Sequence, residues 1–97
     1  MNISIARAIQ ERRLLKLAYH GYYRLVEPHA YGINPDHHEI LRCWQVEGGS
    51  ESGERSGWKL LRVDEIHTMT CTEQRFSSPR NGYKRGDSAM MKNYVQL

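Results

Sequence analysis

The chain has 97 residues, with 14 Lys/Arg against 11 Asp/Glu, five histidines and two cysteines. This length predicts a single domain that folds without disulfides or a structural metal. No apolar run approaches the roughly 20 residues that cross a bilayer, and no signal segment is recognisable, so we expect a soluble, cytoplasmic protein with reduced cysteines.

The positive charge is concentrated near the C-terminus. Residues 1–74 hold nine Lys/Arg against ten Asp/Glu, whereas residues 75–97 hold five Lys/Arg against Asp87 alone. Such a segment can meet phosphates or an acidic partner, or it can be solvated. We therefore divide the chain into a folded domain, residues 1–74, and a basic C-terminal extension, residues 75–97, that docks on this domain or on a partner subunit.

A short opening helix is predicted over residues 4–13. Ile5 and Ile9 lie one turn apart with Ala8 beside them, which gives one apolar face. Asn2 or Ser4 can cap the helix, because either side-chain oxygen can accept from an unpaired amide. We expect the isoleucine face to cover the sheet that follows.

A hairpin is predicted over residues 14–31. Leu15, Leu17 and Tyr19 alternate with smaller or polar residues, and the turn falls at His20 and Gly21. Pro28 interrupts the second strand and cannot donate a ladder hydrogen bond, so it predicts an edge position or a bulge. Along the same strand Arg24 should point away from Glu27, His29 and Tyr31, unless a bulge at Pro28 rotates the chain.

Three further strands are predicted at residues 39–47, 58–63 and 67–72, with a flexible loop at residues 48–57 between the first two. Arg42 falls on the same face as Trp44. One helix and five short strands suggest a small, mainly β domain whose sheet closes into a barrel. The end of the chain, residues 89–97, is apolar enough to dock as a short helix or strand.

The motifs of several catalytic and metal sites are missing. No metal-ligand spacing connects the histidines and cysteines, and no serine or cysteine lies in a recognisable nucleophile motif. Glu27 and His29 can in principle form an acid–base pair, but a buried structural pair explains them equally well. We therefore predict no enzyme activity, no catalytic residues, no metal and no cofactor.

A binding role explains the remaining polar residues better than a catalytic role does. They combine aromatic surfaces with cations, as recognition of a phosphate or a nucleobase requires. The alternative is that the arginines form scattered ion pairs on the surface. The predicted ligand-binding residues are Tyr19, Arg24, His29, Tyr31, Arg42, Lys59 and Arg62.

The order of motifs over residues 3–73 resembles the WYL domain, a module of bacterial transcription regulators. The resemblance rests on the segments AIQERRLLKLAY, YRLVEPHAYG and WKLLRVDEI. The positions that match are Tyr19, Arg24, Val26, Glu27, Pro28, Trp58, Arg62, Asp64 and Ile66. The Trp-Tyr-Leu triplet that names the family falls near Glu39, Ile40 and Leu41, so only the leucine remains and the chain resembles a divergent member.

The resemblance implies an Sm-like or SH3-like β-barrel with a helix packed at one end. It implies a non-enzymatic regulatory domain that senses a nucleic acid or nucleotide through a basic and aromatic pocket, here without its own DNA-binding domain and with a separate DNA-binding regulator as partner. The alternative is a structural interaction module, a homodimer or partner adaptor, in which residues 90–97 pack on another subunit. A small hydrolase that uses Glu27 and His29 is a third hypothesis.

Overall fold

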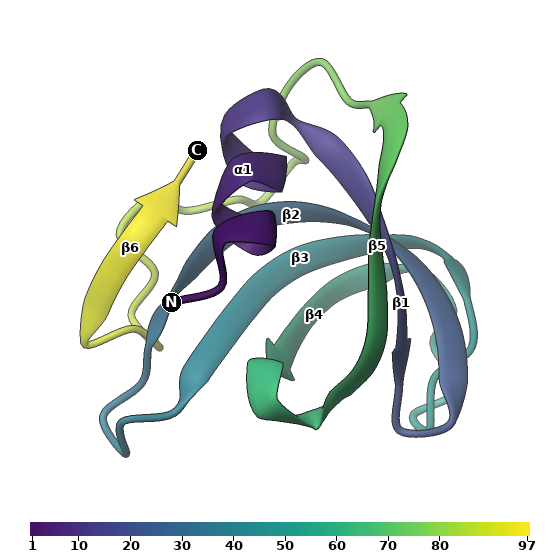
Figure 1. Cartoon of the computed structure of the whole chain (residues 1–97), viewed down its shortest axis with the longest axis horizontal. Helices are drawn as coiled ribbons and strands as arrows, with labels where there is room; N and C mark the ends of the chain where they lie inside the picture. The colour runs from purple at the N-terminus through teal and green to yellow at the C-terminus, as the bar shows by residue number, and fades with distance from the viewer.

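The computed structural model describes all residues, 1–97, as one helix followed by a six-stranded antiparallel sheet (Figure 1). The elements, in chain order, are α1 (Ile3–Glu11), β1 (Arg13–Tyr19), β2 (Tyr22–Ile33), β3 (Glu39–Gly48), β4 (Gly57–Arg62), the 3₁₀ helix η1 (Val63–Glu65), β5 (Ile66–Arg75) and β6 (Lys92–Gln96). The mainly β class with an N-terminal helix is confirmed. No helix in the structure is long and apolar enough to cross a membrane.

The sheet is curved but open, so the prediction of a closed, five-stranded barrel is wrong. The strand order is β4-β3-β2-β1-β5, and β4 and β5 form the two edges without pairing to each other. The three residues of η1 join β4 to β5, while α1 lies between β5 and β6 and packs into the concave side (Figure 1). Helix side chains, rather than hydrogen bonds between edge strands, thus cover much of the core.

The ends of α1 follow from local chemistry. The Asn2 side chain accepts a hydrogen bond from the Ile5 amide at 3.1 Å, which confirms the predicted cap. The helix ends at Glu11, two residues before the predicted end, because Arg12 adopts a left-handed conformation with φ 53°. Ile5, Ala8 and Ile9 are buried, as the apolar spacing predicts.

Strand β2 is shared by three neighbours. It pairs with β3 along one side, and on the other side with β1 through Tyr22–Val26 and with β6 through Ala30–Ile33. Pro28 lies in the gap between β1 and β6, where no ladder bond is required of it.

The predicted bulge is confirmed at the same place. Pro28 faces Cys43 and Ala30 faces Arg42, so His29 is the extra residue on β2. Glu27 and His29 therefore point to the outer face of the sheet, where they meet the C-terminal part of the chain. Because the bulge adds one residue, the Tyr31 side chain points to the opposite face and lies in the core.

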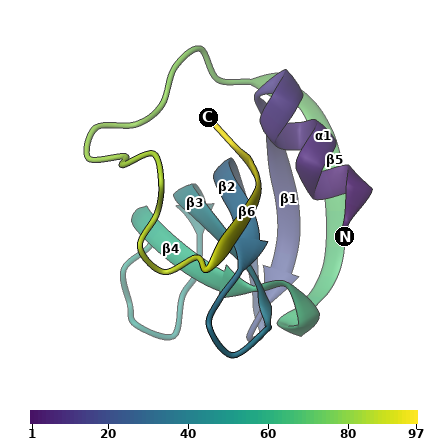
Figure 2. The same cartoon turned by 90° about the vertical axis from the view of Figure 1, so that its left-hand side faces the viewer.

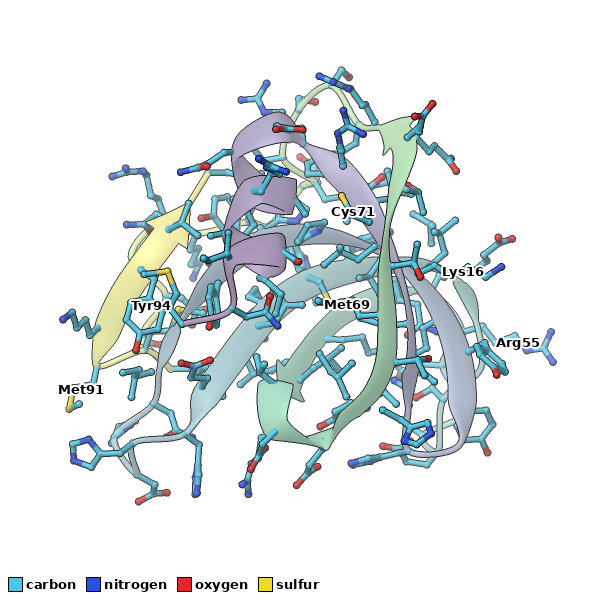
Figure 3. All side chains as sticks on the ribbon, viewed as in Figure 1. Lys16, Arg55, Met69, Cys71, Met91 and Tyr94 are labelled. Atoms are coloured by element: carbon cyan, nitrogen blue, oxygen red, sulfur yellow. The ribbon has the colours of Figure 1, made fainter.

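The main core lies between α1 and the concave face of the sheet. Its buried members are Ile5, Ala8, Ile9, Leu15, Leu17, Tyr19, Val26, Tyr31, Leu41, Cys43 and Leu61. Met69 of β5 packs against this cluster from the edge of the sheet (Figure 3). A smaller cluster of Ala30, Ile40 and Met90 lies on the outer face, so both faces of β2 and β3 are covered.

Candidate functional site

Residues 76–91, called the C-terminal segment below, cross the outer face of β2, β3 and β4 (Figure 2). The segment begins where the Phe76 amide donates to the Arg12 carbonyl at 3.0 Å, and it ends where the Met91 amide donates to the Ile33 carbonyl at 2.7 Å. The basic extension thus lies against its own sheet, and β6 extends that sheet.

An ion pair fixes the first part of the C-terminal segment. The Arg80 guanidinium donates through Nε to Glu27 Oε1 at 2.7 Å and through Nη2 to Glu27 Oε2 at 3.1 Å. The same guanidinium lies 5.3 Å from the centre of the Trp44 ring. Because the Glu27 side chain is only 7% exposed, its carboxylate depends on this forked contact.

His29 provides a second anchor. Its ring is fully buried, with Nδ1 2.8 Å from the Glu27 carbonyl oxygen and Nε2 3.0 Å from the Arg80 amide nitrogen. The Arg80 amide can only donate and the Glu27 carbonyl can only accept, so Nδ1 carries the hydrogen and the ring is neutral. Burial lowers the pKa of His29, which favours this neutral form.

Aromatic rings from β4 and from the C-terminal segment surround His29. The His29 ring contacts Trp58 at 4.8 Å, Tyr83 at 5.1 Å and Phe76 at 5.4 Å between centroids. The Trp58 indole N–H donates to the Asn81 carbonyl at 3.2 Å, and its ring lies 6.1 Å from that of Tyr83. Trp58 therefore connects β4 to the C-terminal segment.

A pocket of about 280 Å³ opens between this segment and strands β3 and β4. Its lining residues are Arg42, Trp58, Gly82, Tyr83, Lys84, Asp87 and Ser88. Gly82 has φ 88°, and a Cβ there would lie 3.2 Å from the Trp58 indole nitrogen, so glycine lets the backbone bend closely around the indole.

The two cations of the pocket differ in their surroundings. Arg42 donates through Nε to Asp87 Oδ2 at 2.7 Å. Lys84 is exposed and has no ion pair or hydrogen bond within the chain. The pocket thus combines two aromatic rings, one neutralised cation and one free cation.

Of the predicted ligand-binding residues, Arg42 lines this pocket and His29 lies behind its aromatic wall. Tyr31 is elsewhere, in the core. Its hydroxyl accepts from the Asn2 amide at 2.6 Å and donates to Glu39, and burial raises its pKa. Tyr31 therefore ties the start of α1 to β3.

Arg24 and Lys59 hold the loop between β3 and β4. Arg24 is 3% exposed, and its Nη2 donates to Glu51 Oε2 at 2.9 Å and to the Tyr19 carbonyl at 3.1 Å. Lys59 Nζ donates to the Glu54 carbonyl at 2.9 Å. Both cations thus make contacts within the chain.

Arg62 and Tyr19 lie near the β1–β2 turn, where the Arg24 guanidinium is 5.1 Å from the centre of the Tyr19 ring. Arg62 Nη2 lies 2.6 Å from Asp64 Oδ2, and the Tyr19 hydroxyl accepts from the Arg62 amide and donates to Glu65. His20 stands next to them, bonded to Glu51 at 2.9 Å and Glu65 at 2.6 Å, and these two carboxylates raise its pKa. The structure therefore places Arg42 at the pocket and the other predicted cations elsewhere. Arg24 meets Tyr19 and shares Glu51 with His20, so it adjoins the site of Arg62. Each of the three arginines has an acidic partner.

Six of the seven lining residues were not singled out for binding from the sequence: Trp58, Gly82, Tyr83, Lys84, Asp87 and Ser88. No spacing rule connects Arg42 with a carboxylate 45 positions later. The one available signal was the excess of positive charge beyond residue 74, which pointed to this part of the chain without indicating its location.

No protein-family model, curated protein or solved structure matches the chain.

Proposed function

We propose that this protein is a non-enzymatic, ligand-sensing regulatory domain that binds nucleotide or nucleic-acid phosphates in the pocket beneath the C-terminal segment. The observation that carries the proposal is the free cation Lys84 beside the Trp58 and Tyr83 rings. Stacking on an aromatic ring combined with a cation for the phosphate is the pairing by which proteins hold nucleotides without reading their sequence.

The pocket accommodates one planar ring and one anionic group. A base stacks on Trp58 or Tyr83, and the phosphate lies toward Lys84 and Arg42. Stacking of a base on an aromatic ring contributes about 1 to 3 kcal/mol, so a single site of this kind gives modest affinity. Asp87, the one carboxylate in the lining, is already bonded to Arg42 and to the Ala89 amide, which favours binding over acid–base catalysis.

We also propose that the chain is a divergent WYL-like domain whose open sheet derives from the Sm-like or SH3-like strand plan. The order of helix and strands supports this, as does the position of the YRLVEPH motif on the bulged strand β2. On this proposal the protein acts in the cytoplasm and signals to a separate DNA-binding regulator. Arg42 contacts the ligand, while His29 supports the aromatic wall from behind.

The test is a titration with adenine nucleotides and short single-stranded oligonucleotides, in which binding is measured by tryptophan fluorescence. Lys84→Ala is expected to weaken binding, and affinity for oligonucleotides should fall from about 50 to 200 mM salt because counterion release is lost. Lys16→Ala is the matched control, since Lys16 is an exposed lysine that points to solvent from β1, away from β6 (Figure 3). Absence of binding at low salt, or equal affinity for wild type and Lys84→Ala, overturns the proposal.

A second candidate is an interaction module, which one observation favours: β5 is an edge strand that pairs only with β1. Unpaired strand edges can add a strand from another chain. Sedimentation at increasing concentration tests this candidate. A dimer that Thr70→Lys returns to monomer supports it, whereas a monomer at every concentration sets it aside.

A further inference from the structure

The Arg42–Asp87 pair stands at the edge of the proposed pocket and joins β3 to the C-terminal segment. Asp87 Oδ2 accepts from Arg42 Nε at 2.7 Å, and Oδ1 lies 3.4 Å from Nη2. Oδ1 also accepts from the Ala89 amide at 2.9 Å, which fixes the turn that leads to Met90. The Asp87 side chain is 9% exposed and that of Arg42 is 27% exposed, so the pair is partly shielded from water.

This contact engages the Nε–Nη2 side of the Arg42 guanidinium. Arg presents its N–H groups as a planar fork that fits carboxylate and phosphate oxygens in the same two-point manner. With Asp87 in place, Arg42 is neutralised and Lys84 is the one cation of the lining that remains free. Arg42 also lowers the pKa of Asp87, so the carboxylate stays charged at neutral pH.

We infer that Asp87 is an internal competitor for the ligand: its carboxylate occupies the position on Arg42 that a ligand phosphate takes, and binding exchanges one anion for the other. This inference rests on the proposed function. It names the ligand class as a phosphomonoester on a planar base, because a group with two negative charges competes with a carboxylate better than a phosphodiester with one.

The exchange also gives the domain a means of signalling. When Asp87 leaves Arg42, the turn through Ala89 loses its ion pair with β3. Met90, which packs on Ala30 and Ile40, and the following strand β6 lie directly after that turn. Ligand binding is thereby coupled to the position of the chain between the pocket and β6.

The decisive variant is Asp87→Asn, titrated with adenosine 5′-monophosphate. Asparagine keeps an oxygen for the Ala89 amide but removes the charge that competes for Arg42. We expect the dissociation constant to fall by about three- to tenfold, the effect of removing one partly exposed charge pair. Asp64→Asn is the matched control, because Asp64 pairs with Arg62 at 2.6 Å outside the pocket; it should leave affinity unchanged.

Two further measurements separate the inference from the proposed function. In an Arg42→Gln background Asp87→Asn should have no effect on affinity. In the wild-type protein, adenosine 5′-monophosphate should shift the amide resonance of Ala89 together with the indole resonance of Trp58, a readout that does not depend on any variant folding. A Trp58 shift with Ala89 unmoved, or an Asp87→Asn variant that binds no tighter, overturns the competitor role while the proposed function stands. If neither wild type nor Asp87→Asn binds the nucleotide, both are overturned.

Discussion

Replacement of Tyr31 by Phe removes one oxygen from the core and separates a structural role from a ligand-binding role. Tyr31 is fully buried, and its hydroxyl accepts from the Asn2 amide at 2.6 Å while donating to Glu39. The variant keeps the ring and its edge contact with Tyr94 at 5.1 Å. It leaves the Asn2 amide without an acceptor at the start of α1.

The expected loss of stability follows from these two hydrogen bonds. Leaving a buried polar group unpaired costs about 1 to 3 kcal/mol. The Glu39 side chain is 31% exposed, so water can replace one of the two bonds, and we expect about 1 to 2 kcal/mol. For a domain of this size that corresponds to a decrease in melting temperature of about 5 to 15 °C.

Urea unfolding followed by circular dichroism measures the effect as a lower midpoint with an unchanged slope. Tyr94→Phe is the matched control, since the Tyr94 hydroxyl makes no hydrogen bond within the chain, and it should cost less than about 0.5 kcal/mol. Equal stability of the two variants would refute the reasoning. Tyr31→Phe should also leave nucleotide affinity unchanged, because Tyr31 lies in the core and not in the pocket.

Two other predictions concern the anchors of the C-terminal segment. Because burial lowers the pKa of His29, its neutral form stabilises the fold above about pH 6.5, and the midpoint of urea unfolding should fall as the pH drops below that value. The pKa of His20 is raised, so its contribution acts in the opposite direction and is lost as the pH rises. Comparison of wild type with His29→Gln separates the two histidines. An identical pH dependence of stability in both proteins contradicts the role of His29. Arg80→Ala leaves the buried Glu27 carboxylate unpaired and should cost about 2 to 3 kcal/mol, whereas Arg85→Ala, whose one bond is to the Leu97 carbonyl, should cost little. Equal midpoints of unfolding for these two variants would show that Glu27 does not depend on Arg80.

Local chemistry made several elements predictable. Asn2 caps α1 because its oxygen can reach an unpaired amide, and the spacing of Ile5 and Ile9 identifies the buried face. Pro28 indicated the bulge because it has no hydrogen to donate. These inferences depend on neighbours within a few residues, which the sequence shows directly.

The arrangement of side chains across the sheet was less predictable. The bulge adds one residue to β2, and a shift of one residue moves every later side chain to the other face. Tyr31 is therefore in the core, although alternation without the bulge places it with His29. Whether the sheet closes depends on how α1 fills its concave side, and whether Arg42 meets Asp87 depends on the path of the C-terminal segment. The spacing of residues along the sequence determines neither the closure of the sheet nor the contact between Arg42 and Asp87.

The division of one edge of β2 between β1 and β6 gives the two partners separate stabilities. Because residues 27 and 28 pair with neither strand on that edge, β6 can detach in a local opening while the β1–β2 hairpin keeps every hydrogen bond. The amides that join β6 to β2 should accordingly exchange with deuterium sooner than those of the hairpin. Strand β6 can therefore separate from the sheet and pair again while the rest of the domain stays folded.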